Sequence, residues 1–559
     1  MADNTTTIEL GGPVKAVETS NAVHTLGHVR LRDVHTNEII LIPAPSDDPR
    51  DPLNWPQWFK YYTAVAVCLA MVLCNFLAAG PTLAILQTAM DFFPNWQETG
   101  IDGAVAKTAY FFNCTALFQG LGNLLWMPLI NKYGRRAVYV VAFSIYVITA
   151  VWCSVAKQYA NFLVARIVMG IAAGAGECLG PLTIADVFFL HERGAVTAMY
   201  NASLNLGVAI GAIVDGFIVK YQPWRYIYYV AIALIGAVTL MVYFTFPETA
   251  YNRSYDVHGI TTTMHSESRS YHHADAKGEG EGTDVGHVES SSPSITARRT
   301  GFKGSFTQGL KLYHGTFTEE SLWHLATRPV LLLALPSVFW ATMVMSVTIG
   351  FITAITSNVS PAFTTAYGFE AWQSGLCFFA GVIGALLGVV LGGHFSDWVA
   401  DYFTRRNGGI REPEMRLPAI MISVITGPLA LVLYGVGIQN TMHWMVPTLG
   451  IGLINFTITQ ATNVSLVYTI DSYRPIAGEV VVTQLAFKSA FGFLLGFYTN
   501  PWVDTHGYAV AYGEMAAICG GVLVFWIPLF VWGKTLREKT ISWRIMKYVR
   551  WDADREVGE

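Results

Sequence analysis

Long apolar stretches alternate with short polar segments along most of the chain. Each stretch holds about 20 residues, which is the length that an α-helix needs to cross the hydrocarbon core of a bilayer. The stretches cover 61–84, 106–130, 137–155, 161–185, 196–219, 224–246, 331–356, 371–394, 417–437, 443–466, 479–501 and 510–533. The pattern predicts an all-α membrane protein with twelve transmembrane helices, arranged as two bundles of six.

One long polar gap separates the two bundles. We expect an N-terminal tail over 1–60, a first six-helix bundle over 61–246, a central loop over 247–330, a second six-helix bundle over 331–533 and a C-terminal tail over 534–559. Residues 266–300 are rich in Ser, Gly and Glu, which predicts disorder. The segment is interpreted as a tether between the bundles, and a phosphorylated regulatory segment is the alternative.

The distribution of Lys and Arg predicts the orientation of the helices. With the N-terminus in the cytoplasm, all but six of the 35 Lys and Arg residues fall in segments on the cytoplasmic side. The positive-inside rule therefore predicts that both termini are cytoplasmic. The exceptions are Lys107, Lys157, Lys220 and Arg225 on the outer side and Arg166 and Lys488 within spans.

Composition argues against several other classes of protein. Charged residues make up 13% of the chain and the net charge is −4, so no basic surface suits a nucleic acid. The seven Cys lack the paired spacing of a disulfide or zinc framework. The sequence has no Gly-x-x-x-x-Gly-Lys-[Ser/Thr] string of the kind that ATP-driven pumps need. We therefore expect no enzyme activity, no cofactor and no metal site.

The loop after the second predicted helix carries a short cationic motif. It reads NKYGRR over 131–136, and its charges alone would suit the positive-inside rule. The motif and the six-plus-six layout resemble the major facilitator superfamily, whose signature in this loop is Gly-x-x-x-Asp-Arg-x-Gly-Arg-Arg. Lys132, Gly134, Arg135 and Arg136 match its second half, and Asn131 stands at its Asp position.

The loop after the eighth predicted helix keeps more of the first half of that signature. It reads GGHFSD over 392–397, with Asp397 at the position of the signature's Asp. In the superfamily this motif helps to latch the two bundles together. The resemblance therefore implies that both loops belong to a gate.

The fourth predicted helix carries charges at membrane depth. Arg166 and Glu177 lie on one face at 100° per residue, and Asp186 follows at the inner end. Charges so deep are costly and usually face a cavity or a partner. The Arg-x-x-x-Gly spacing resembles a helix-4 signature of the superfamily that is associated with proton coupling, and a structural ion pair is the alternative. Asp186 is expected near Arg135 and Arg136, as a gate contact.

Polar stripes follow the fifth and tenth predicted helices. Asn201, Asn205 and Asp215 share a face of the fifth helix, and Asn455 and Asn463 share one of the tenth. These stripes suit substrate contacts, and hydrogen bonds between helices are the alternative. The fifth helix also resembles the antiporter signature Gly-x-x-x-Gly-Pro-x-x-Gly-Gly, with an alanine for the proline and Asp215 for a glycine.

Depth along the helices predicts which charges meet. At 1.5 Å per residue, Arg166 and Asp215 lie roughly 10 and 12 Å outward of the midplane, on neighbouring helices. We expect them to form an ion pair. Glu177 would then be left without a fixed cation, which makes it our first choice for binding a proton or a cationic substrate.

Lys488 lies near the middle of the eleventh predicted helix, with Gln484 on the same face. Its depth favours a position facing the cavity, and a lysine that extends to the membrane surface is the alternative. Lys488 is expected either to neutralise Glu177 in one conformation or to hold an anionic group of the substrate. Glu479 is interpreted as a helix-start carboxylate.

Flanking segments resemble the fungal drug:proton antiporter branch of the superfamily. They read DPLNWP over 51–56, WRYIYY over 224–229, PETAYNR over 247–253 and RRNGGIREPEMR over 405–416. The resemblance covers about 51–540. It implies a monomer in the lipid bilayer that exports a small organic solute, such as a drug, secondary metabolite or amine, in exchange for protons. The plasma membrane is expected, with the vacuolar membrane as the alternative. Uptake of an amine or polyamine and a non-transporting nutrient sensor are the alternative functions.

Overall fold

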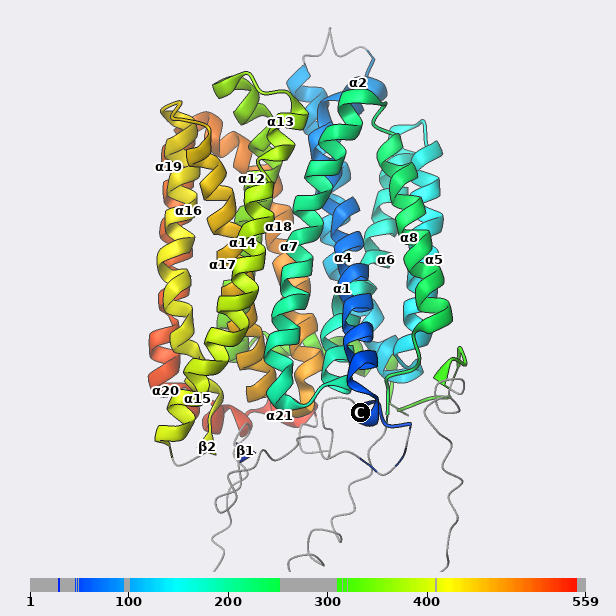
Figure 1. Cartoon of the computed structure of the whole chain (residues 1–559), viewed down its shortest axis with the longest axis vertical. Helices are drawn as coiled ribbons and strands as arrows, with labels where there is room; N and C mark the ends of the chain where they lie inside the picture. The colour runs from blue at the N-terminus through cyan, green and yellow to red at the C-terminus, as the bar shows by residue number, and fades with distance from the viewer. Residues whose placement is uncertain are drawn as a thin grey trace, which may run out of the picture.

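The computed structural model describes residues 29–30, 46, 48, 50–94, 101–251, 309–313, 315–318, 320–407 and 410–549. Long helices run side by side through this part of the chain (Figure 1). We call the end that carries α21 and the strands β1 and β2 the lower end, and the end that carries α2 and α13 the upper end (Figure 1). The segment 266–300, for which disorder is predicted, lies outside the described residues.

The first half of the chain contains α1 (Gln57–Ala79), α2 (Ile85–Phe92), α4 (Ile101–Tyr133), α5 (Arg135–Val155), α6 (Tyr159–Val187), α7 (Leu190–Tyr221) and α8 (Tyr226–Thr245), with 3-10 turns η1 (Pro52–Asn54) and η2 (Gly80–Ala84). Local sequence explains two of the breaks. Pro81 follows α1 and has no backbone N–H with which to continue the helix. Gly134 separates α4 from α5 with φ of 89°, a conformation that a residue without Cβ adopts at little cost.

The second half contains α11 (Leu322–Leu332), α12 (Pro336–Tyr367), α13 (Ala371–Leu376), α14 (Phe379–Val389), the π-helical turn η3 (Val390–Phe395), α15 (Ser396–Arg406), η4 (Pro413–Ile420), α16 (Met421–Gln439), α17 (Met445–Ser472), η5 (Arg474–Ile476), α18 (Ala477–His506), α19 (Tyr508–Val524), α20 (Trp526–Ile541) and α21 (Arg544–Val549). Pro336 opens α12, where its missing N–H costs nothing. Gly368 closes the same helix in the left-handed conformation, with φ of 66°.

Ten helical stretches in the described part of the chain are long and apolar enough to cross a membrane. The other two predicted spans coincide with α4 and α17, which have 33 and 28 residues but are not among the ten. Both helices carry many Asn, Gln and Thr residues, which lower their hydropathy. The multi-pass helical architecture is therefore established, and the count of twelve spans stays a prediction.

Several predicted segments differ in detail from the helices of the structure. The span predicted over 371–394 is built from α13, α14 and η3, and α15 continues it to Arg406. The span predicted over 510–533 is divided at Phe525 between α19 and α20. The central loop predicted over 247–330 contains most of α11, because the apolar residues of the segment LWHLATRPVLL recur at helical spacing and pack inward.

Buried apolar side chains form two large clusters. One gathers mainly α1 and α4 to α8, and the other mainly α12 to α20. Between the two halves, α4 packs against α18 and α7 packs against α13 and α14. Outward-facing side chains such as Leu240, Phe244, Val531 and Trp532 are exposed, which is the pattern of helices that are solvated by lipid.

The lower end carries the only β-structure among the described residues. β1 (Val29–Arg30) pairs antiparallel with β2 (Ile410–Arg411), so a short piece of the N-terminal tail contacts the loop between α15 and η4. α11 lies at the same end, between α4, α18 and α21. Segments far apart in sequence therefore meet beneath the bundles.

Candidate functional site

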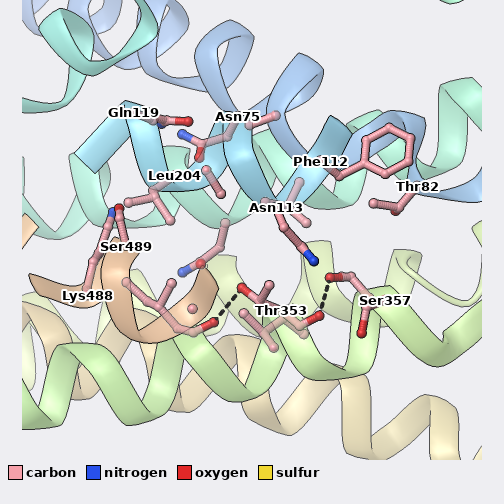
Figure 2. Close-up of a pocket in the computed structure, with 18 of the residues that line it drawn as sticks. Asn75, Thr82, Phe112, Asn113, Gln119, Leu204, Thr353, Ser357, Lys488 and Ser489 are labelled. Carbon is pink, nitrogen blue, oxygen red and sulfur yellow. Dashed lines mark hydrogen bonds between the residues drawn. The ribbon is translucent and has the colours of Figure 1, made fainter. Parts of the chain in front are cut away.

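A cavity of about 110 Å³ lies between the two halves. Its lining comes from α1, η2, α4, α6 and α7 of the first half and from α12, α17 and α18 of the second. Figure 2 shows these side chains pointing toward one another from two groups of helices. Five of the lining residues are carboxamides, namely Asn75, Asn113, Gln119, Asn205 and Asn455. Phe112 is the only aromatic residue of the lining.

One ion pair in the cavity lining joins the halves. Lys488 Nζ on α18 lies 3.0 Å from Glu177 Oε1 on α6. Both residues are buried, with exposed fractions of 4% and 1%. In so little water the two charges attract each other strongly, and neither is stable there without the other.

Two amides of α4 complete the surroundings of Glu177. Gln119 Nε2 donates to Glu177 Oε1 at 2.8 Å, and Asn123 Nδ2 donates to Oε2 at 3.0 Å. The prediction that Glu177 lacks a fixed cation is therefore wrong. Of the two roles expected for Lys488, neutralising Glu177 is the one that this structure contains.

The predicted ion pair between Arg166 and Asp215 is not formed. Arg166 instead donates to three backbone carbonyl oxygens, of Phe111 at 3.2 Å, Leu77 at 2.9 Å and Ala78 at 3.5 Å. Leu77 lies four residues before Pro81, whose missing N–H leaves this carbonyl without its usual helical donor. Arg166 therefore donates to the end of α1 and not to Asp215, the partner that was predicted from depth.

Asp215 is fully buried on α7, and neither of its carboxylate oxygens has a hydrogen-bond partner in the described part of the chain. It is also absent from the lining of the cavity. The face that it was predicted to share with Asn205 therefore does not place both residues in one site.

The polar stripes on α7 and α17 mainly join the two halves. Asn205 Nδ2 donates to Thr459 Oγ1 at 3.1 Å, and Asn201 Nδ2 donates to Asn463 Oδ1 at 3.4 Å. Asn463 also donates to the carbonyl oxygen of Gly392 at 2.7 Å. Asn205 and Asn455 line the cavity, whereas Asn463 does not.

Gln484 is not part of the cavity. It is fully buried and donates to Thr469 Oγ1 on α17 at 2.9 Å. Gln484 is one helical turn from Lys488, as predicted, but only Lys488 lines the cavity, and Gln484 is hydrogen-bonded to α17 instead.

Three carboxamides of the lining turn their NH₂ groups toward the protein. Asn75, Asn205 and Asn455 each donate to the backbone carbonyl oxygen four residues earlier, at 3.1, 3.4 and 2.8 Å. A carbonyl oxygen can only accept, so this contact fixes which end of each amide faces it. The Oδ1 atom of each amide is therefore the end that faces away from this carbonyl oxygen, and in a residue of the cavity lining it can serve as an acceptor.

A buried ion pair lies at the lower end of the first half. Arg135 Nε is 2.9 Å from Asp186 Oδ2, and Arg135 Nη2 donates to Oδ1 at 3.3 Å. Asp186 therefore contacts Arg135 of the cationic loop, and its role as a gate contact stays a prediction. Arg136 instead donates to the backbone carbonyl oxygens of Val242 and Tyr243 on α8 and of Phe246, which follows that helix. The distance to the oxygen of Tyr243 is 2.7 Å.

Glu248 holds the cationic loop from below. Its carboxylate accepts from the backbone N–H groups of Arg135 at 2.8 Å and Arg136 at 3.1 Å, which open α5. A carboxylate at the start of a helix is stabilised by the unpaired N–H groups and by the helix dipole. Lys132, half-buried at the end of α4, has no ion pair among the described residues.

Gly134 offers a first test of this loop. We expect Gly134→Ala to destabilise the protein by about 1–3 kcal/mol, because φ of 89° is strained for alanine. A Cβ there would also lie 2.5 Å from Glu248 Oε2. The measurement is thermal unfolding in detergent. Gly236→Ala on α8 is the control, since a Cβ at that position meets nothing within 4 Å. Equal melting temperatures for the two variants would contradict the expectation.

Asp397, in the segment 392–397 that resembles the signature, contacts both halves. Asp397 Oδ1 accepts from Arg416 Nη1 at 2.7 Å, within its own half. A Cβ built on Gly194 would lie 2.7 Å from the same oxygen, so the carboxylate packs against the first turn of α7. Gly194 therefore allows a close contact between the halves at the lower end.

The halves also touch above the cavity. Lys220 Nζ at the end of α7 lies 3.7 Å from the ring centroid of Trp372 on α13. A second contact joins Tyr110 on α4 and Phe497 on α18, whose ring centroids are 4.7 Å apart. The halves therefore contact each other both above the cavity, at these two places, and at the lower end, where Asp397 packs against Gly194.

Sequence reasoning did not link Gln119 and Asn123 to Glu177, and it missed much of the lower ion-pair network. Gln119 and Asn123 are four residues apart on α4, a spacing that could have indicated a shared partner. Arg328, Glu414 and Arg416 gave no such signal, because they lie in segments that were predicted to be loops. No group of three His, Cys, Asp or Glu residues in the described part of the chain is arranged to hold a metal ion.

Comparison with known proteins agrees with this architecture. Residues 65–475 match the family model described as Major Facilitator Superfamily. The chain is 25% identical to an uncharacterized MFS-type transporter of Schizosaccharomyces pombe, over 90% of this chain and 89% of that protein. It is 24% identical to the efflux pump radE of Floropilus chiversii, over 88% and 84%.

A solved structure has a similar fold. It is the proton:xylose symporter XylE from E. coli, bound to 6-bromo-6-deoxy-D-glucose. The TM-score is 0.58 at 14% identity, over 85% of this chain and 97% of the symporter. This likeness concerns the course of the backbone.

Proposed function

Because the chain belongs to the Major Facilitator Superfamily, we propose that it exports a small organic molecule in exchange for protons by alternating access. Membership confirms the predicted family and fold. It makes the protein a multi-pass membrane transporter of small solutes and not an enzyme. The solute, the direction and the coupling ion belong to the proposal.

The observation that carries the proposal is the Glu177–Lys488 ion pair. It links α6 to α18 across the cavity wall, at an N–O distance of 3.0 Å. A proton bound by Glu177 removes the negative charge that holds Lys488, so protonation weakens the contact between the halves. Deprotonation restores it. Proton binding and the opening of the cavity are then two parts of one step.

The size of the cavity supports a closed stage of the cycle. Pockets for drug-sized ligands measure about 300–1,000 Å³. At about 110 Å³ this cavity holds much less. A solute therefore enters only after the contacts on one side separate, either those of Trp372 above or those of Asp397 below. This is the order of events that alternating access requires.

Direction and substrate rest on two separate observations. Export is supported by the relative that is named an efflux pump. The second candidate is proton-coupled uptake of an amine or polyamine. It is favoured by the amide oxygens of Asn75, Asn205 and Asn455, which can accept hydrogen bonds from an ammonium group beside Glu177.

We place the lower end in the cytoplasm, which the Lys and Arg distribution supports. The plasma membrane is the proposed location and the vacuolar membrane the alternative. A nutrient sensor would bind a solute without moving it. Flux is therefore the property that separates the two functions.

The test is solute flux in proteoliposomes with an imposed pH gradient. A mixture of drugs, secondary metabolites and amines is supplied, and the contents are identified by mass spectrometry. We expect at least one compound to move against its gradient, and an uncoupler to abolish the movement. Movement toward the acidic compartment indicates exchange for protons, and movement with the protons indicates uptake. Binding without flux would contradict transport.

A further inference from the structure

The segment that leads into the second half, described over 309–313, 315–318 and 320–335, contacts both halves at the lower end. We call it the connector. It begins on the first half, where Phe317 N donates to the carbonyl oxygen of Lys132 at 3.0 Å. The ring of Phe317 lies against Gly134, within 3.0 Å of the position that a Cβ would take. Just before it, the carbonyl oxygen of Gly309 accepts from Glu248 N at 3.0 Å. This part of the connector is thus bound to the cationic loop (131–136) and to Glu248, which contacts that loop.

The connector then continues as α11 and reaches the second half. Arg328 is fully buried on α11 and lies 2.8 Å from Glu320 Oε2 and 3.8 Å from Glu479 Oε1. Glu479 is in the first turn of α18. One turn later, Thr483 Oγ1 donates to the carbonyl oxygen of Pro329 at 2.5 Å. The start of α18 is therefore bound to α11 by a charged and a neutral contact.

We propose that α11 is a latch that holds the lower end closed, with Arg328 as its positioning residue. The inference rests on the proposed alternating access, because the lower end must open for the latch to matter. The signature's acidic position in the first half is occupied by Asn131, which carries no charge. Glu479 supplies a carboxylate at the start of α18, and Arg328 joins it to a connector that the first half holds.

Electrostatics explains why both charges belong to the latch. The N-terminus of α18 carries the positive end of a helix dipole, which repels a buried guanidinium. Glu479, in the first turn of α18, carries the negative charge that offsets both. Loss of either Arg328 or Glu479 removes the charged contact but leaves the hydrogen bond of Thr483 in place. The latch is therefore weakened and the fold of α18 is kept.

The two halves also meet directly beside this latch. Ala477 at the start of α18 is buried in a small cluster with Ala185 of α6. A cysteine at position 477 is shielded while the lower end is closed and becomes exposed when it opens. Its reaction with a water-soluble maleimide therefore reports the latch without any solute.

The experiment measures maleimide labelling of Ala477→Cys protein in lipid nanodiscs, with the unmodified protein as the background. We expect Arg328→Gln and Glu479→Gln to increase the labelling rate severalfold, and Arg328→Lys to stay near the parent rate. Arg405→Gln is the matched control, because Arg405 is an exposed arginine in the last turn of α15. Unchanged labelling in both latch variants, or an equal rise in the control, would overturn the proposal.

Two features keep the result decisive. If Arg328→Gln does not yield folded protein, Glu479→Gln answers the question, because it leaves Arg328 paired with Glu320. Labelling also needs no transport. If the latch variants raise the labelling rate but the protein shows no measurable flux, only the proposed function is disproved. If the protein shows flux but the latch variants leave the labelling rate unchanged, only the latch is disproved.

Discussion

Glu177→Gln is expected to destabilise the protein by about 3–5 kcal/mol, the cost of leaving a buried charge without its partner. Lys488 is 4% exposed, and Glu177 is its only ion-pair partner among the described residues. The glutamine can still accept from Gln119 or Asn123, but it does not neutralise the ammonium group. The measurement is thermal unfolding of the purified protein in detergent.

The matched control removes both charges. Glu177→Gln combined with Lys488→Met replaces the ion pair with uncharged side chains of similar size, which costs little or nothing. We therefore expect the double variant to melt close to the parent protein and well above the single variant. A double variant that is as unstable as Glu177→Gln would show that the charges are not the reason for the loss.

Arg135→Gln is expected to have the second-largest effect, also about 3–5 kcal/mol. Asp186 is 1% exposed and would keep the hydroxyl of Thr249 at 3.3 Å, but would lose both contacts to the guanidinium. The substitution leaves the backbone bond from Arg135 to Glu248 intact, so the loss reports the side chain. Thermal unfolding again gives the magnitude.

Lys132→Gln is the control for this prediction. It removes a positive charge from the same loop, but the Lys132 side chain has no ion pair in the described part of the chain. The expected change is within about 0.5 kcal/mol. If the two variants melted together, net charge in the loop would matter and the Arg135–Asp186 geometry would not.

Helical spans and the lower ion pair could be read from the sequence for clear physical reasons. The thickness of the bilayer sets the length of each apolar stretch, so most of the helices can be located from hydropathy alone. Arg135 and Asp186 carry opposite charges and lie at neighbouring helix ends on the same side. The predicted spans over 106–130 and 443–466 also coincide with α4 and α17, although Asn, Gln and Thr residues lower the hydropathy of both helices and neither is among the ten apolar stretches.

The pairing of charges within the bundle could not be read from depth alone. Arg166 and Asp215 were predicted at similar levels, yet Arg166 donates to backbone carbonyl oxygens, among them that of Leu77, which Pro81 leaves open at the end of α1. Lys488 of α18 reaches Glu177 of α6 because α18 packs against both α4 and α6. Gly120 permits that approach, since a Cβ there would overlap the side chain of Ser489. Packing between helices distant in sequence thus decided both outcomes.

Flux through the Glu177→Gln and Lys488→Met double variant tests the central claim most directly. The double variant keeps the helices and the cavity but has no group at this position that can exchange a proton for an ion pair. We predict that a solute driven by a pH gradient in the parent protein no longer accumulates with the double variant, in proteoliposomes that hold equal amounts of each. Gradient-driven accumulation at the parent rate would contradict the assignment of proton coupling to this pair.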